Sequence, residues 1–156
     1  MSDSMAGRAA GGTLGRTMAL DYGDRRIGIA LSDELGVAAR PLLTLSRTRW
    51  SEDLERLKAL VREHDVRRIV VGLPLDMDGR KGGRARLTEA VIEKIRGATG
   101  LPVLPWDERL TTVQAERILI EGDVSRARRR KVIDQVAAVI LLQTWLDAQR
   151  PTDVAE

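Results

Sequence analysis

The chain of 156 residues has no cysteine and only one histidine, His64. Without cysteine, disulfides and thiolate metal sites are impossible, a composition that fits a cytoplasmic protein. His64 stands near the end of an expected surface helix, where a solvated or helix-capping histidine is the favoured interpretation. A Ser-His-Asp triad and a zinc site built on His or Cys are therefore not expected.

Other common features are also missing. There is no GxxxxGK[ST] pattern, which argues against a P-loop nucleotide site. The longest uninterrupted apolar run, residues 136–142, is far shorter than the roughly 20 residues that span a bilayer, so no membrane partner is expected. Aromatic residues make up only 3% of the chain, and we expect Trp106 and Trp145 in the core rather than as base-stacking platforms.

Hydrophobic residues account for 43% of the chain, enough for one folded domain with a real core. We assign residues 17–149 to this domain, between a flexible N-terminal tail at 1–16 and a C-terminal tail at 150–156. Alternation of large and small residues predicts an antiparallel meander of three strands at 17–21, 26–32 and 41–45. From Trp50 onward, helical patterns alternate with apolar runs.

This second half predicts strands at 69–72 and 103–106. Helices are expected from residue 50, over 82–100 with Gly97 and Gly100 as stops, over 111–122, and over 125–149. The predicted fold class is α/β: a mixed five-stranded sheet with helices on both faces. In such sheets, ligands gather beyond the carboxyl ends of the parallel strands.

Three carboxylates stand where predicted elements meet solvent: Asp21, Glu108 and Asp134. Clustered carboxylates bind Mg²⁺ or Mn²⁺, because a divalent ion relieves their mutual repulsion. Two such ions, about 3.5–4 Å apart, can hold both the attacking and the leaving oxygen of a phosphodiester. The three acids therefore predict a metal site that hydrolyses phosphodiesters without histidine.

Each acid has an alternative role. Asp21 could cap the turn at Gly23, Glu108 could be a surface charge like its neighbour Asp107, and Asp134 could be a favourable acid near the start of a helix. Two further acids, Asp24 and Asp33, are interpreted as loop residues, with Asp24 the better candidate for an auxiliary ligand.

The formal net charge is only +3, with a sequence pI of about 9.8, but the cations are concentrated in blocks. One block, in a glycine-rich loop, comprises Arg80, Lys81, Arg84 and Arg86. The other comprises Arg126, Arg128, Arg129, Arg130 and Lys131. Either block alone would suit a solvated face. Together, close in sequence to the acids, they favour phosphate contact.

Four motifs in order resemble the YqgF-type family, whose members are described as pre-16S ribosomal RNA nucleases or Holliday-junction-resolvase-like proteins. The motifs are LDYG at 20–23 with RRIGIA at 25–30 and SD at 32–33; GLPL at 72–75 with MDG at 77–79; DERLTT at 107–112; and Lys131 with IDQVAA at 133–138 and LQ at 142–143. The resemblance covers roughly residues 17–147.

The resemblance implies a ribonuclease-H-like fold and a divalent-metal site, with Asp21, Glu108 and Asp134 as catalytic carboxylates. We expect Arg25, Arg109 and the 126–131 block to contact phosphates. Maturation of the pre-16S ribosomal RNA end is favoured on the resemblance alone, with Holliday junction resolution as the alternative substrate. Neither RNA against DNA, nor Mg²⁺ against Mn²⁺, nor the cleavage position, nor monomer against homodimer is decided by the residues.

Two rivals belong to other classes. The DxG strand pair also opens actin-like and sugar-kinase ATPases, but those need a second domain for which this chain is too short. The other rival is a catalytically idle nucleic-acid-binding protein that keeps the fold.

Overall fold

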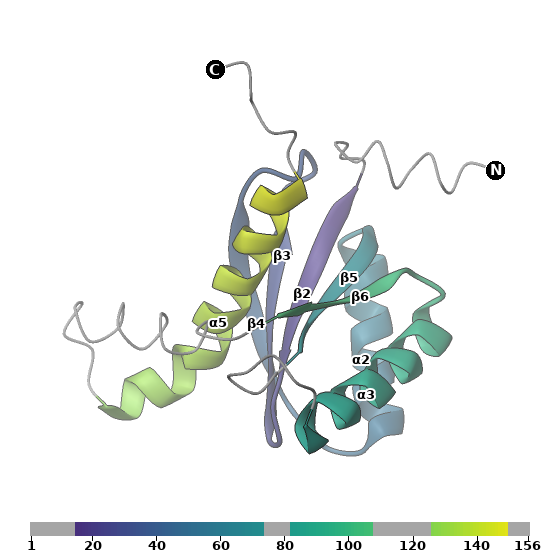
Figure 1. Cartoon of the computed structure of the whole chain (residues 1–156), viewed down its shortest axis with the longest axis vertical. Helices are drawn as coiled ribbons and strands as arrows, with labels where there is room; N and C mark the ends of the chain where they lie inside the picture. Colours follow the sequence, from purple (N-terminus) through teal and green to yellow (C-terminus); the bar gives the residue numbers. More distant parts are fainter. Residues whose placement is uncertain (1–14, 74–81, 108–125, 150–156) are drawn as a thin grey trace.

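The computed structural model describes residues 15–73, 82–107 and 126–149, which contain one five-stranded sheet in the order β4-β3-β2-β5-β6 (Figure 1). The strands are β2 (Arg16–Tyr22), β3 (Arg26–Ser32), β4 (Ala39–Ser46), β5 (Val66–Leu73) and β6 (Val103–Asp107). The helices are α2 (Trp50–Glu63), α3 (Gly83–Thr99) and α5 (Arg126–Gln149). The predicted mixed sheet is confirmed.

The first three strands form the predicted antiparallel meander, and β3 has the predicted bounds. β4 begins two residues earlier than expected, on the far side of Pro41. The register shifts between Ile29, which pairs with Leu43, and Ala30, which pairs with Pro41. An outer strand with an irregular register tolerates proline, because the missing N–H is not needed by a second neighbour.

The parallel half consists of β2, β5 and β6. β2 is the central strand of the sheet. Because β2, β5 and β6 are parallel, their carboxyl ends lie at the same edge of the sheet. This edge is where the sequence places its candidate ligands. β5 is longer than predicted because it also includes Val66, Arg67 and Arg68, whose polar members conceal the strand in the sequence pattern.

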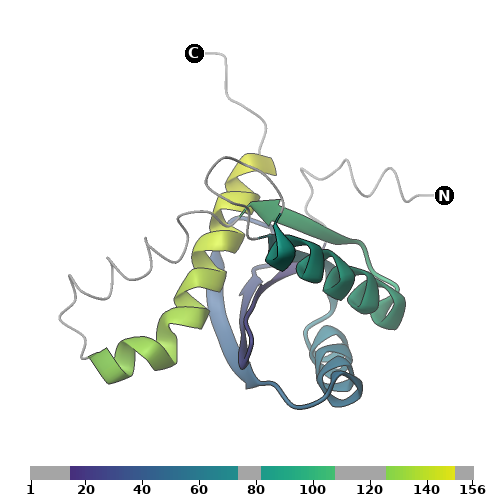
Figure 2. The same cartoon turned by 60° about the horizontal axis from the view of Figure 1, so that its bottom comes forward.

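Helices cover both faces of the sheet, as predicted (Figure 2): α5 lies on one face, and α2 and α3 lie on the other. The larger core cluster, on the α2 and α3 side, uses bulky residues such as Leu20, Ile29 and Val71. The second cluster, under α5, uses small strand residues, Ala19 and Ala30, beside Val70. The alternation of large and small residues along β2 and β3 thus sets the two sides of the sheet.

Several smaller predictions can be compared with these elements. His64 is the C-cap of α2, and its amide donates to Leu60 O at 3.0 Å, as expected for a capping histidine. Gly100 ends α3 with a φ of 73°, whereas the helix continues through Gly97. Trp145 is buried and Trp106 half-buried, both in the second core cluster.

The helix predicted at 111–122 lies outside the described residues, as do nearly all of both predicted tails; Arg16, assigned to the N-terminal tail, begins β2. Within the part of the chain that is described, no helix combines the length and apolarity needed to cross a membrane.

Candidate metal and nucleic-acid site

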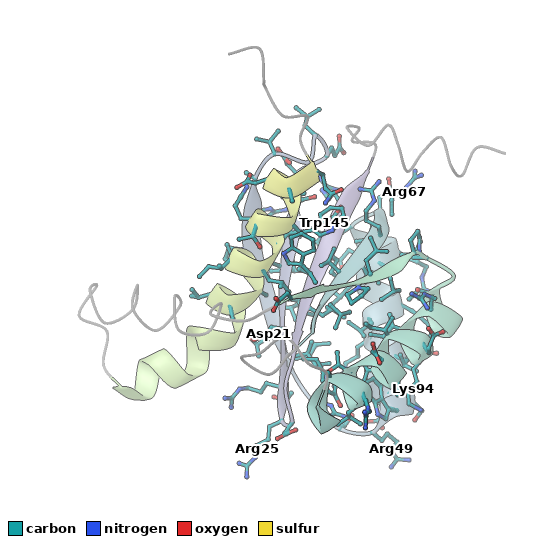
Figure 3. The ribbon with its side chains drawn as sticks, viewed as in Figure 1. Asp21, Arg25, Arg49, Arg67, Lys94 and Trp145 are labelled. Carbon is teal, nitrogen blue, oxygen red and sulfur yellow. The ribbon has the colours of Figure 1, made fainter. Side chains whose placement is uncertain are left out.

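Asp21 occupies the next-to-last position of the central strand β2 and is half-buried. Side chains alternate along a strand, so Asp21 shares the α5 face of the sheet with Ala19. Its register partner on β3 is Gly28, which carries no side chain. Figure 3 shows Asp21 between Trp145 of α5 and Arg25, which lies in the turn between β2 and β3. A carboxylate therefore stands where the α5-side core ends.

The turn that follows Asp21 is closed by its own backbone. The Gly23 amide donates to Arg26 O at 2.9 Å. A Cβ at Gly23 would come within 3.0 Å of that same oxygen, so the tight turn favours glycine.

The end of β6 is joined to α5 by a side-chain contact. Trp106 Nε1 donates to Thr144 Oγ1 at 3.0 Å, and Trp106 packs against the second core cluster. Gly72 of β5 pairs with Trp106, and Leu73 pairs with Asp107. Glu108 follows immediately and lies outside the described residues. The structure thus fixes the strand that leads to Glu108.

Asp134 belongs to α5, as predicted, but only its helical backbone is described; the side chains of residues 126–134 lie outside the described part. Its position is one helical turn before Ala138, a fully buried member of the second core cluster. The direction of α5 is set at its other end. Gln143 Oε1 accepts from the Ala39 amide at 2.9 Å, and Ala39 pairs with Ser32 beside the amino end of β2.

Of the three predicted metal ligands, only Asp21 has a described side chain. Among the side chains that are described, no three acids or histidines come together as a metal site. Asp33 is confirmed as a loop residue, because its Oδ1 accepts the amides of Val37 and Ala38 at 2.8 and 3.3 Å. Asp24 is exposed in the turn after β2, near the carboxyl end of that strand.

Of the phosphate contacts predicted at Arg25, Arg109 and residues 126–131, only Arg25 has a described side chain. Arg25 is exposed at the tip of the β2–β3 hairpin, at the same end of the molecule as Arg49 and Lys94 (Figure 3). The block at 126–131 forms the first turns of α5. Arg109 lies outside the described residues.

An interaction network at the start of α2 is absent from the sequence-based prediction. Asp53 stands in the first turn of α2, where an acid is favoured by the helix dipole alone, yet its side chain is fully buried. It accepts hydrogen bonds from Arg56 at 2.7 Å and from the Thr48 amide at 3.1 Å. Burial alone would raise the pKa of Asp53, but the bonds from Thr48 and Arg56 outweigh it and hold the pKa below its usual value of 3.8.

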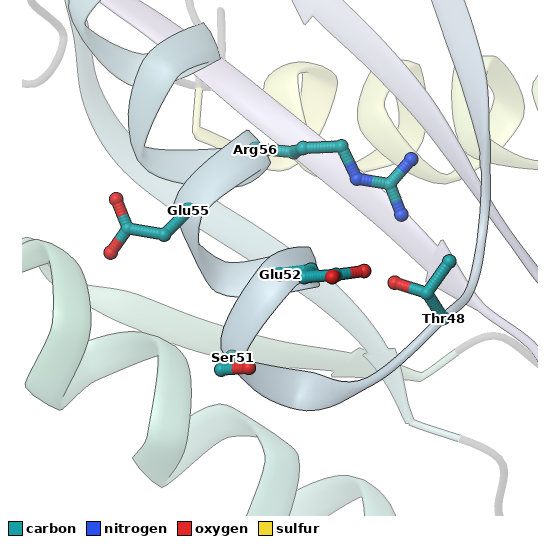
Figure 4. A pocket seen from close by; sticks show the side chains of 5 residues that line it. All are labelled: Thr48, Ser51, Glu52, Glu55 and Arg56. Carbon is teal, nitrogen blue, oxygen red and sulfur yellow. The ribbon is translucent and has the colours of Figure 1, made fainter.

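An open depression lies beside this network (Figure 4). It is lined by Thr48, Ser51, Glu52, Glu55 and Arg56. Its two glutamates repel phosphates, so this depression does not suit a nucleic-acid backbone.

Comparison with known proteins assigns the family. The family model described as "RuvX: Holliday junction resolvase" matches residues 15–148. The chain belongs to the RuvX family. A relative from Symbiobacterium thermophilum, named "Putative pre-16S rRNA nuclease", is 54% identical over 130 residues, which cover 83% of this chain and 90% of the relative. A relative of the same name from Myxococcus xanthus is 51% identical over 138 residues, with 88% and 91% covered.

Solved structures support the fold. The fowlpox virus resolvase bound to Holliday junction DNA aligns with a TM-score of 0.56 at 10% identity, covering 85% of this chain and 97% of that one. RuvC from T. thermophilus, also bound to a Holliday junction, gives 0.50 at 16% identity, covering 86% and 94%. The RuvX chain therefore has the predicted ribonuclease-H-like fold, within a family named for nucleases.

Proposed function

We propose that this RuvX protein is a divalent-metal-dependent nuclease in which Asp21, Glu108 and Asp134 hold Mg²⁺ or Mn²⁺. The observation that carries the proposal is the position of Asp21. It lies at the carboxyl end of the central strand, on the α5 face, beside Gly28. Ligands in sheets of this kind bind at that edge.

Backbone spacing supports the approach of Asp134 to Asp21. Ala19 of β2 and Ala138 of α5 are both fully buried, and both belong to the second core cluster. Asp21 stands two strand residues beyond Ala19, about 6.6 Å along β2. Asp134 stands four helical residues before Ala138, about 6 Å along α5. Both steps lead away from the same core cluster toward the carboxyl end of β2.

The same kind of argument applies to Glu108. Trp106 faces α5, as its bond to Thr144 requires. Side chains alternate along a strand, so one more extended residue after Asp107 would bring Glu108 to the α5 face. This face also carries Asp21.

The chemistry follows from the ligands. Bound divalent ions supply an activated water and stabilise charge on the departing oxygen of a phosphodiester. Asp21, Glu108 and Asp134 provide hard oxygen ligands of the kind these ions prefer. Gly28, the register partner of Asp21, adds no side chain beside the carboxylate. Substrate phosphates would be contacted by Arg25, Arg109 and the cations Arg126, Arg128, Arg129, Arg130 and Lys131. These contacts would fix the nucleic-acid strand in register.

For the substrate, we favour the pre-16S ribosomal RNA end, on the names of the relatives, with the cytoplasm as the compartment. The Holliday junction is the second candidate, because the family model carries that description. Junction resolution needs two active sites, so a homodimer in solution would favour it, and a monomer would favour trimming of an RNA end.

The test is cleavage of three substrates by the purified protein with Mn²⁺ or Mg²⁺: a pre-16S RNA fragment, a four-way DNA junction and single-stranded DNA. We expect metal-dependent cleavage of the RNA fragment that EDTA stops. Cleavage of the junction alone would favour the second candidate, and no cleavage of any substrate would contradict the nuclease proposal.

Replacement of Asp21 tests the site itself. Asp21→Asn removes a charged ligand with little change of shape, so cleavage should fall by at least about 100-fold while substrate binding persists. Asp65→Asn is the matched control and should cleave normally, because Asp65 lies between α2 and the amino end of β5. Cleavage by Asp21→Asn at the wild-type rate would remove Asp21 from the site.

A further inference from the structure

Arg47, in the segment between β4 and α2, has an almost buried side chain, with 17% of it exposed. Its guanidinium contacts two separate parts of the molecule. One is the β2–β3 hairpin, which directly follows Asp21. The other is the first turn of α2. No sequence motif singles out this arginine.

On the hairpin side, Arg47 Nη1 donates to Asp24 O at 3.2 Å and lies 3.4 Å from Gly23 O. The guanidinium carbon also lies 4.7 Å from the centre of the Tyr22 ring. The Arg47 amide donates to Arg25 O at 2.8 Å. Arg47 therefore contacts every residue of the hairpin from the one after Asp21 to Arg25 at its tip.

On the helix side, the same guanidinium lies 4.9 Å from the centre of the Trp50 ring, which is stacked on Tyr22 with 5.7 Å between ring centres. Arg47 Nε lies 3.6 Å from Asp53 Oδ2, and the Asp53 carboxylate is fully buried. A cation between two aromatic rings and a buried carboxylate has little freedom to move. The helix thus provides a fixed support for the hairpin.

Arg56 provides a natural comparison. It pairs with the same carboxylate, with Nη2 at 2.7 Å from Asp53 Oδ1, and it donates to Ser46 O at 2.6 Å. None of its described bonds reaches the hairpin. The two arginines therefore share a buried partner but differ in whether they also hold the residues after Asp21.

We infer that Arg47 is a positioning residue of the proposed nuclease site: it ties the β2–β3 hairpin to α2 and so fixes Asp21 and Arg25 relative to each other. The inference rests on the proposed function. Metal ligands and phosphate contacts must keep their geometry to within a fraction of an ångström, and a displacement of about 1 Å can cost about 100-fold in rate.

The experiment compares Arg47→Gln with Arg56→Gln in the full chain. Amide hydrogen exchange at Gly23 reports hairpin opening, and kinetics on the RNA fragment with saturating Mn²⁺ separate kcat from KM. Arg47→Gln should speed exchange at Gly23 by about tenfold and lower kcat by about tenfold, with a smaller change in KM. Arg56→Gln should lower Tm but keep Gly23 exchange and kcat within about twofold of wild type.

Arg47→Lys is the conservative variant. Lysine keeps the charge but lacks the planar fork that reaches the hairpin carbonyls, the rings and Asp53 together. It should therefore restore Tm more than it restores kcat, and it replaces Arg47→Gln in the comparison if the glutamine variant does not fold.

The outcomes separate the two proposals. Equal Gly23 exchange or equal kcat in the Arg47 and Arg56 variants would overturn the positioning role, since both changes disturb Asp53. Cleavage of no substrate by the wild-type protein would instead contradict the nuclease function. In that case faster Gly23 exchange in the Arg47 variant alone would still support the tether.

Discussion

Asp21 and Gly28 are register partners on the antiparallel strands β2 and β3. Partners of this kind point to the same face of a sheet, with their Cβ positions only about 5 Å apart. The carboxylate of Asp21 therefore stands beside a residue without a side chain, on the face that α5 covers. The sequence RIGIALS of β3 places its smallest residue, Gly28, next to the acid that the proposed mechanism needs most.

Gly28→Ala tests whether Asp21 needs a neighbour without a side chain. The added methyl group would stand beside the Asp21 carboxylate, and we expect kcat to fall by about tenfold because the metal ligand is displaced. The control is Gly97→Ala in α3, where a Cβ would meet open space. That change should stabilise the protein by about 0.5–1 kcal/mol and leave kcat unchanged. Wild-type kcat in Gly28→Ala would contradict the need for a residue without a side chain beside Asp21.

Arg25 is expected to contact a substrate phosphate from the tip of the hairpin. Arg25→Ala should weaken binding to the RNA fragment and reduce the slope of log K against log salt by about 0.7, the value for one contact to a single strand. Filter binding or fluorescence anisotropy over a salt series measures both. Arg67→Ala is the control, since Arg67 pairs with Asp65 away from the hairpin (Figure 3). An equal change of slope in the two variants would indicate non-specific charge effects.

Asp53 makes stability depend on pH. Its pKa is lower in the folded state than in the unfolded state, because the bonds from Thr48 and Arg56 overcome the effect of burial. The unfolded chain therefore takes up the proton first as pH falls, and the stabilisation, complete well above pH 3.8, is lost as pH falls through the folded pKa.

Asp53→Asn should accordingly cost about 2–3 kcal/mol at pH 7, because two arginines lose their buried partner. The difference from wild type should shrink below about pH 4. Urea unfolding at several pH values measures it. A difference that stays constant down to pH 3 would show that folding does not lower the pKa of Asp53.

Thr144→Val tests the link between β6 and α5. Valine keeps the shape of threonine but cannot accept the bond from Trp106 Nε1. We expect a loss of about 0.5–1.5 kcal/mol in the free energy of unfolding, since the indole N–H loses its partner. Tryptophan fluorescence during urea unfolding gives the value. Thr99→Val is a comparison that leaves Trp106 untouched, because the Thr99 hydroxyl donates to Ile95 O and accepts from the Leu101 amide just after α3.

The sequence predicts the fold well where one pattern dominates. β3 has the predicted bounds, and large and small residues alternate without interruption from Ile27 to Ser32. β5 is predicted too short because Arg67 and Arg68 look like loop residues. Arg68 is nevertheless held in the strand, where its Nη1 donates to Thr17 Oγ1 at 2.9 Å.

The candidate site is only partly accessible to sequence reasoning. Asp21 is found because a carboxylate ends an apolar run, a local signal. Arg47 and Asp53 are missed because their importance arises from tertiary contacts: an acid in the first turn of a helix normally faces solvent. In the folded chain Asp53 is buried among Thr48, Arg47 and Arg56, and Arg47 lies over the rings of Tyr22 and Trp50.

The most direct test of the central claim is a crystal structure of the protein with Mn²⁺, in which anomalous scattering locates the metal. The account predicts a peak with carboxylate oxygens of Asp21, Glu108 and Asp134 at about 2.1 Å, and no peak in the Asp21→Asn variant. Mn²⁺ bound elsewhere, with these three carboxylates on separate surfaces, would contradict it.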